Sequence, residues 1–252
     1  MKIQYCSDLH IEFSRNYQFL FRNKIKAIGD ILILAGDIQL LASNPQKDNF
    51  LDYLSETFKE IFWLPGNHEY YQSSISKYES YFSEKIRENM TLLNNTVVKR
   101  NGVNLIFSTL WGKISVKKEI MVRLSMNDFH VISYNLHKLT VKDFNDLHQT
   151  SVDFIVSSLE SLKGGKNVVI THHVPTLDNY PEKYKNSELN EAFAVELKPL
   201  IEQYQPDYWI YGHSHANTPE FNIGKTKLVT NQLGYVELRE HYSYRPDAYI
   251  EL

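Results

Sequence analysis

The sequence has few of the features that mark secreted or membrane proteins. Among its 252 residues there is a single cysteine, Cys6, so no internal disulfide can form, and this favours a reducing compartment. No apolar run approaches the roughly 18 residues that span a bilayer. The chain reaches Asp8 before an apolar signal segment has formed. We therefore expect a cytoplasmic protein without a membrane segment.

The charges are nearly balanced and provide no broad basic surface. Lys and Arg number 27 and Asp and Glu number 30, for a formal net charge of −3. Long duplex nucleic acid is therefore not an expected partner, although this balance is compatible with a small nucleotide or a nucleic-acid end as substrate. No repeat, low-complexity tract or Pro/Gly/Ser-rich linker divides the chain. We expect a single domain over residues 1–252.

Short apolar runs alternate with helical patterns along the chain. Strands buried on both faces are predicted at residues 3–6, 31–35, 61–64, 167–171 and 207–211. Helices are predicted at residues 49–60, 151–162 and 188–204, with Pro199 expected to kink or break the last one. Asn101-Gly102 between two β-rich runs predicts a hairpin, and short β runs dominate from residue 226 onward. This order predicts an α/β fold of mixed sheets covered by helices.

Polar side chains follow each of the five predicted strands directly. The clusters are Asp8-Leu9-His10, Gly36-Asp37, Gly66-Asn67-His68-Glu69, His172-His173 and Gly212-His213-Ser214-His215. Because ligands bind at the carboxyl ends of strands in open α/β sheets, we expect the clusters to converge in one crevice. Carboxylate and imidazole groups together suit Mn, Fe and Zn better than Mg or Ca. The clusters therefore predict a transition-metal site.

Each cluster taken alone has a simpler interpretation. A lone Gly-Asp is a turn, a lone Asp-x-His is mostly surface composition, and His172-His173 is compatible with one buried, hydrogen-bonded histidine at a strand end. The joint occurrence of all five at strand ends favours the metal site. Asn127-Asp128-Phe129 is interpreted as a helix cap rather than a wall of the site. The other histidines are interpreted as surface or core-edge residues: His130, His137, His148 and His241.

The order of these motifs, from residue 8 to residue 215, resembles the calcineurin-like metallophosphoesterase superfamily, and the stretches 7–13, 64–71 and 109–111 resemble its small bacterial members. The resemblance implies a four-layer α/β/β/α sandwich of two mixed β-sheets flanked by helices. It also implies two transition-metal ions (Mn, Fe or Zn) that share Asp37. One ion would be held by Asp8, His10, Asp37 and His215. The other would be held by Asp37, Asn67, His172 and His213.

The resemblance further implies hydrolysis of phosphodiesters, or of small phosphorylated metabolites or nucleotides, by direct attack of a metal-bridging hydroxide. His68 is then the catalytic general acid, Glu69 orients His68 or a neighbouring ligand, and His173 supports a ligand or faces the substrate. The chain lacks the second acid that many relatives have in 36–40, and it has Pro65 where protein phosphatases have arginine. Because arginine forks grip phosphomonoester dianions, this favours phosphodiesters or small substrates over phosphoproteins.

Two other functions stay open at this point. A catalytically silent protein of the same fold would be a scaffold that binds a protein partner, but such proteins usually lose ligands, and here every ligand position is filled. A dinuclear hydrolase of other substrates would show a pattern such as His-x-His-x-Asp-His, which the sequence lacks. The physiological substrate, the native metals and the oligomeric state stay undetermined by the sequence.

Overall fold

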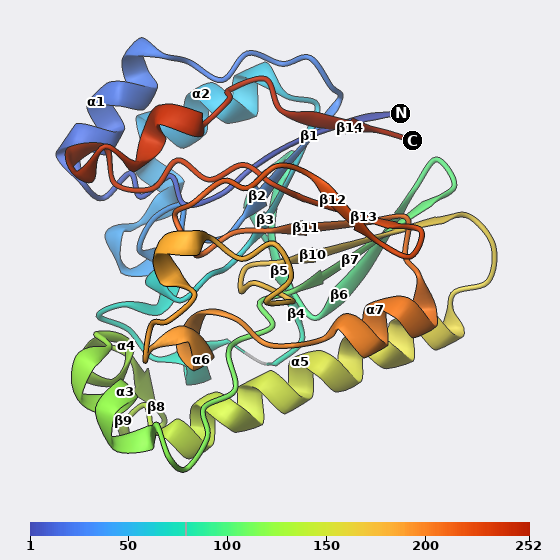
Figure 1. Ribbon diagram of the computed structural model, residues 1–252. Helices are drawn as coiled ribbons and strands as arrows, with labels where there is room; N and C mark the ends of the chain where they lie inside the picture. Colours follow the sequence, from blue (N-terminus) through green and yellow to red (C-terminus); the bar gives the residue numbers. More distant parts are fainter. Residues whose placement is uncertain (79) are drawn as a thin grey trace.

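Two six-stranded mixed sheets pack face to face in the computed structural model, which describes residues 1–78 and 80–252 (Figure 1). The first sheet has the order β14-β1-β2-β3-β5-β4. Its strands are β1 (Lys2–Cys6), β2 (Ile31–Ala35), β3 (Glu60–Leu64), β4 (Phe82–Arg87), β5 (Met90–Asn94) and β14 (Tyr249–Glu251). The second sheet has the order β12-β13-β11-β10-β7-β6. Its strands are β6 (Thr96–Arg100), β7 (Val103–Ser108), β10 (Lys166–Thr171), β11 (Tyr208–Tyr211), β12 (Phe221–Ile223) and β13 (Thr226–Thr230).

Helices cover the outer face of each sheet, so the predicted four-layer α/β/β/α sandwich is confirmed (Figure 1). The first sheet is covered by α1 (Ser14–Arg22) and α2 (Asn49–Thr57), and the second by α5 (Val141–Ser161) and α7 (Lys198–Tyr204). Shorter elements are α3 (Glu119–Ser125), α4 (Asp128–Val131), α6 (Asn190–Phe193), β8 (Ser133–Tyr134) and β9 (His137–Lys138). No helix among the described residues has the length and apolar character needed to cross a membrane.

The central strands are buried on both faces, which explains their continuous apolar runs. Along β2, Leu32 and Leu34 pack in the cluster formed with α1 and α2, whereas Ile31 and Ile33 pack in the cluster between the two sheets. This alternation follows from the two-residue period of a strand. In both sheets four neighbouring strands are parallel and only the edge strands are antiparallel. Parallel strands end on the same side of a sheet, and this places the polar clusters together.

Two predicted helices differ from the observed ones. The pattern at 151–162 is the second half of α5, which begins ten residues earlier, at Val141, with a capping box between Thr140 and Asp143. The pattern at 188–204 forms two helices, α6 and α7, with extended backbone at Ala194 between them. Pro199 lies in the first turn of α7, where the missing N–H costs nothing. The predicted hairpin joins β6 to β7 through Asn101 and Gly102.

Candidate metal centre

Hydrogen bonds between the loops hold the five polar clusters at one edge of the sandwich. The N–H of Asp8 donates to the carbonyl of Gly36 at 2.9 Å, and the N–H of His10 donates to the carbonyl of Asp37 at 3.0 Å. Across the two sheets, the N–H of His213 donates to Oδ1 of Asp8 at 3.0 Å. The loops that follow β1, β2 and β11 are therefore joined directly. This places the side chains that they carry within reach of one another.

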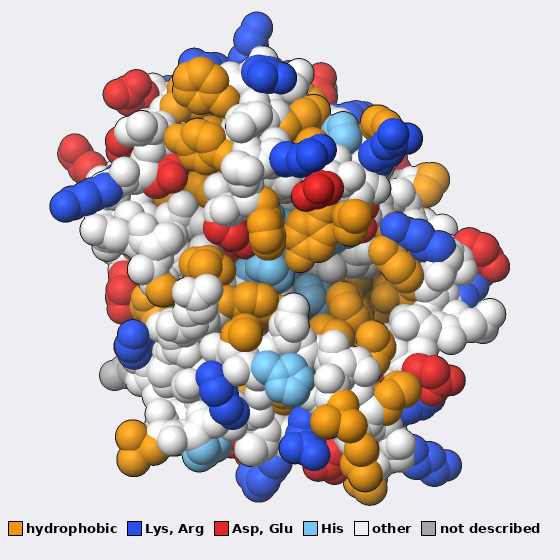
Figure 2. Space-filling model, turned by 90° about the vertical axis from the view of Figure 1, so that its left-hand side faces the viewer, with side chains coloured by type: hydrophobic (Ala, Val, Ile, Leu, Met, Phe, Trp, Pro, Cys, Tyr) orange, Lys and Arg blue, Asp and Glu red, His pale blue; other side chains and the backbone are white. Residues whose placement is uncertain are grey.

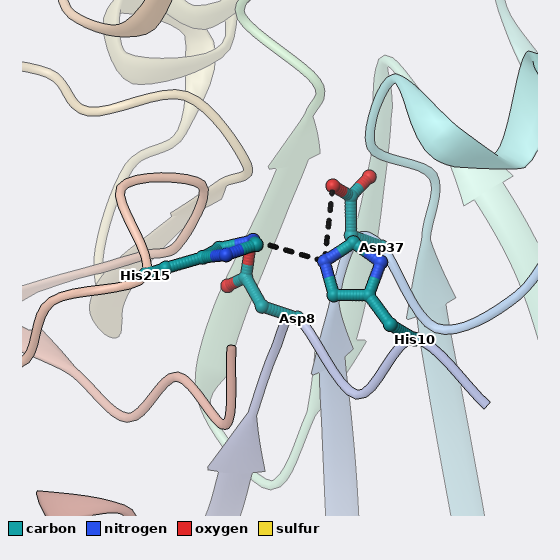
Figure 3. Close-up of side chains that lie close together, drawn as sticks. All are labelled: Asp8, His10, Asp37 and His215. Carbon is teal, nitrogen blue, oxygen red and sulfur yellow. Dashed lines mark hydrogen bonds and ion pairs between the residues drawn. The ribbon is translucent and has the colours of Figure 1, made fainter. Parts of the chain in front are cut away.

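One group of four side chains consists of Asp8, His10, Asp37 and His215 (Figure 3). Their ligand atoms all lie within 4.8 Å of one another. Nε2 of His10 lies 2.9 Å from Nε2 of His215 and 3.8 Å from Oδ2 of Asp37. Nε2 of His215 lies 3.4 Å from Oδ1 of Asp8. Two carboxylates and two imidazoles thus face one point, as a four-coordinate metal site requires.

A second group consists of Asp37, His172 and His213, again within 4.8 Å of one another. Nε2 of His172 lies 3.3 Å from Oδ1 of Asp37 and 3.1 Å from Nδ1 of His213. Asp37 therefore turns its Oδ2 toward the first group and its Oδ1 toward the second. The buried Oδ1 of Asn67 has no hydrogen-bond partner among the described residues. An orphaned acceptor of this kind fits metal coordination, because a buried polar atom otherwise costs about 1–3 kcal/mol.

Glycine at position 66 is required by the close packing of the shared carboxylate. A Cβ atom on Gly66 would lie 2.6 Å from Nε2 of His172 and closer still to Oδ1 of Asp37. A side chain at position 36 would also collide with the imidazole ring of His172, because a Cβ atom on Gly36 would lie 2.6 Å from Cγ of His172. The two glycines thus leave room for Asp37 and His172 to approach each other.

The electrostatics of the cluster favour bound cations. Burial by itself raises the pKa of Asp37, but His172 and His68 hold it well below its usual value. Burial lowers the pKa of His172, but Asp37 raises it to about 9. Burial likewise lowers the pKa of His215, and its contacts with Asp8 and Glu240 raise it to about 10. Positive charge on its neighbours thus keeps Asp37 ionised, and divalent ions would supply this charge more strongly than protons.

Neighbouring acceptors fix the orientation of the histidine rings. Nδ1 of His172 donates to the carbonyl of Ala35 at 2.9 Å, which leaves Nε2 as the ring nitrogen that faces Asp37. Nδ1 of His215 donates to Oε2 of Glu240 at 2.8 Å. Such carboxylate–histidine contacts are usual behind metal ligands, because they select the tautomer and raise the basicity of the ligating nitrogen.

His68 lies beside these groups, next to the proposed ligand Asn67. Its backbone N–H donates to Oδ1 of Asp37 at 2.9 Å. Its Nδ1 lies 3.0 Å from Oε1 of Glu12, and its Nε2 lies 3.4 Å from the hydroxyl of Tyr235. The ring stacks on Tyr71, with centroids 4.1 Å apart. Burial lowers the pKa of His68, but Asp37 and Glu12 outweigh it and raise the pKa.

Glu69 contacts the backbone of the site rather than the ring of His68. Its buried carboxylate accepts hydrogen bonds from the N–H groups of Asp37, Ile38 and Gly66 and from the indole of Trp63, at 2.7–2.9 Å. Of the two roles that the sequence left open for Glu69, the structure shows contact with the neighbouring residue Asp37.

Asp128 and His173 lie at the edge of the clusters. Oδ1 of Asp128 accepts from Nδ2 of Asn67 at 2.9 Å and from the hydroxyl of Tyr71 at 2.6 Å, and this aims the amide oxygen of Asn67 into the site. Asn127 is the N-cap residue of α4, as the helix-cap interpretation has it, but that interpretation missed the contact of Asp128 with Asn67, which is 61 residues away and left no sequence signal. His173 lies outside both groups of possible ligands, and its Nδ1 contacts the carbonyl of Thr109 at 3.1 Å.

A cavity of about 350 Å³ opens directly over the clusters. Figure 2 shows the hollow on this face, with histidine side chains at its floor. Its walls carry aromatic rings and small polar groups, among them Tyr71, Tyr180, Tyr184, Phe193 and Tyr235. Neither lysine nor arginine occurs among the described residues that line it. The site is thus open to a small molecule, and the charged side chains that line it belong to the clusters and to Glu240.

The layered fold and the paired Asp/His groups are those of a metal-dependent hydrolase of phosphoric esters. The chain belongs to the calcineurin-like phosphoesterase family, whose model matches residues 1–217. An uncharacterised protein of Acanthamoeba polyphaga mimivirus is 34% identical over 282 aligned positions, which cover 99% of this chain and 96% of the viral protein. The crystal structure of phosphopantetheinyl hydrolase from Mycobacterium tuberculosis has the same fold, with a TM-score of 0.73 and 16% identity over 99% of this chain and 95% of that one.

Proposed function

We propose that the chain hydrolyses phosphodiesters, or small phosphorylated metabolites or nucleotides, at a centre of two transition-metal ions. The observation that carries this proposal is the orientation of Asp37, whose two carboxylate oxygens face two separate groups of ligand atoms. A carboxylate in this position can serve two ions at once. The first ion would be held by Asp8, His10, Asp37 and His215. The second would be held by Asp37, Asn67, His172 and His213.

The donor set accepts Mn, Fe or Zn, since all of these bind mixed carboxylate and imidazole ligands. When bound, two such ions supply positive charge to the phosphoryl oxygens and activate water at neutral pH. The chain itself contributes the remaining group that the reaction needs. His68 turns Nε2 toward the cavity, where it donates a proton to the oxygen that leaves phosphorus.

The lining of the cavity favours a phosphodiester over a phosphomonoester. A monoester dianion is usually gripped by arginine forks, and neither arginine nor lysine occurs among the described lining residues. A diester carries only one negative charge, and its two substituents suit walls with tyrosine and phenylalanine rings. Phosphopantetheine esters belong among the compounds to be tested, because a solved structure of the same fold is a phosphopantetheinyl hydrolase.

The test is metal analysis of the purified protein followed by a panel of esters. The protein is stripped with a chelator, reloaded with Mn, Zn or Fe, and assayed on matched monoesters and diesters of the same alcohol. We expect two ions per chain and faster turnover of the diesters. A protein with both ions bound that hydrolyses no ester would refute the proposal and favour a scaffold that binds a protein partner. Faster turnover of the monoesters would refute the diester preference.

A further inference from the structure

Glu12 lies two residues after His10 and contacts two histidines of the site. Its Oε1 lies 3.0 Å from Nδ1 of His68 and 3.3 Å from Nδ1 of His10. The rings of His10 and His68 lie edge to face, with centroids 4.4 Å apart. One carboxylate oxygen therefore accepts from a proposed metal ligand and from the proposed proton donor.

Among the described residues, the hydrogen bonds of the Glu12 side chain go to the site alone. The two histidines are its only hydrogen-bond partners among the described residues, and its Oε2 is buried without a partner. The side chain is only 12% exposed. Glu69 is the opposite case, since its two oxygens accept four N–H groups that hold the backbone. A buried carboxylate with one oxygen that lacks a hydrogen-bond partner destabilises the fold. Glu12 therefore does not stabilise the fold, and its role lies in its contacts with the rings of His10 and His68.

Resting on the proposed function, we infer that Glu12 is the residue that positions His68 for proton donation and ties it to the metal ligand His10. Because Oε1 of Glu12 accepts a hydrogen bond from the Nδ1–H group of His68, the ring is held with Nε2 toward the cavity. Stacking on Tyr71 restrains the plane of the same ring. As the bond between phosphorus and the ester oxygen breaks, the proton on Nε2 passes to that oxygen. The proton on Nδ1 stays on His68, hydrogen-bonded to Glu12.

The contact with His10 adds a second consequence. His10 faces the first ligand group with Nε2 and faces Glu12 with Nδ1. The position of the proton donor is thus set relative to the metal ligand through a single oxygen atom. The same three side chains also bring donor atoms within 4.8 Å of one another, so the test must distinguish positioning from binding of a further ion.

The experiment compares Glu12→Ala and Glu12→Gln in the metal-loaded protein on two diesters of the same phosphate group, one with a p-nitrophenyl and one with an alkyl leaving group. An alkoxide needs a proton to leave, whereas p-nitrophenolate leaves without one. We expect Glu12→Ala to lose about 10–100-fold in kcat on the alkyl ester and to keep most of its rate on the aryl ester. Glu12→Gln recovers part of the loss, because its amide oxygen still accepts from Nδ1.

Glu240→Gln is the matched control, because Glu240 makes the same kind of contact with His215 but none with His68. We expect this variant to slow both esters in the same proportion and to bind metal more weakly. The double variant Glu12→Ala/His68→Ala should be no slower on the alkyl ester than His68→Ala, because Glu12 acts through His68. Elemental analysis at saturating metal should count two ions per chain in both Glu12 variants, and the esters are assayed at that metal concentration because loss of the contact with His10 weakens metal binding as well.

Three results would overturn the inference. The first is an equal loss on the two esters in Glu12→Gln, and the second is a double variant whose losses multiply. The third is a wild-type protein that holds three ions and loses one in Glu12→Gln, which makes Glu12 a ligand. All three require an active wild-type protein. A wild-type protein inert on both esters instead refutes the proposed hydrolysis, so the two failures are distinguishable.

Discussion

Replacing Gly66 by alanine tests the position of Asp37 without removing any proposed ligand. The new Cβ would lie 2.6 Å from Nε2 of His172 and closer still to Oδ1 of Asp37, whereas ordinary contacts begin near 3.4 Å. The φ angle of Gly66 is not in the left-handed region, so the backbone tolerates alanine and the clash acts on the two side chains. Relieving it requires a shift of about 1 Å, which typically costs about 10²-fold in rate when it misplaces a reacting group.

The shift also exceeds the tolerance of a metal site, where ligand distances hold to about 0.2 Å. We expect Gly66→Ala to bind both ions more weakly, because the displaced carboxylate is shared. In the metal-free protein, overpacking should lower the free energy of unfolding by about 1–3 kcal/mol. Elemental analysis after gel filtration counts the ions, kcat/KM on a diester reports activity, and urea denaturation reports stability.

Gly164→Ala is the control, because a Cβ at Gly164 would have no atom within 4 Å. Its φ of +74° is left-handed, so alanine there costs about 1 kcal/mol of backbone strain but should leave the ion count unchanged. A Gly66→Ala variant that retains two ions with wild-type affinity and full activity would contradict the expected clash. Asp37 would then lie elsewhere than between the two groups.

Three further predictions concern other parts of the site. His68→Ala should keep both ions and lose roughly 10²–10⁴-fold on esters with poor leaving groups, and full activity on such esters would remove His68 from the reaction. Glu69→Gln should lower the free energy of unfolding of the metal-free protein by about 1–3 kcal/mol, because one oxygen becomes an NH₂ facing buried N–H donors that then lack an acceptor; an unchanged urea midpoint would contradict this. Chelation should lower the melting temperature, since ions at 100 times their Kd add about 2.7 kcal/mol per site, and an unchanged melting temperature would show that the folded state binds no ion.

The positions of the five strands that precede the polar clusters were predictable from local sequence, whereas β4 and β5 were not predicted. A strand buried on both faces reads as a continuous apolar run, and β2 and β10 are of this kind. The cluster that follows such a strand must lie at its carboxyl end, so Asp37 and His172 were placed near each other before any coordinates. The assignment of these residues as metal ligands stays a prediction that the experiments above test.

The side chains that hydrogen-bond to the proposed ligands and to His68 were not predictable from local sequence. Glu12 and Asp128 reach the site only through side-chain directions that depend on how the loops fold over it. Glu240 approaches His215 from a segment 25 residues further along the chain. The first half of α5 was missed because its buried face carries the polar residue His148, which weakens the apolar period.

Backbone conformation supplies an independent argument that the strand-end clusters serve function rather than turn formation. Five of the seven proposed ligands have φ angles between +46° and +75°: Asp8, His10, Asp37, His213 and His215. Such angles cost about 1–2 kcal/mol per residue for side chains other than glycine, and glycine would relieve the strain at each position. Glycine has no side chain to bind an ion. The local preference for glycine is overridden at these positions because carboxylates and imidazoles are needed there, and strain of this kind gathers at functional sites.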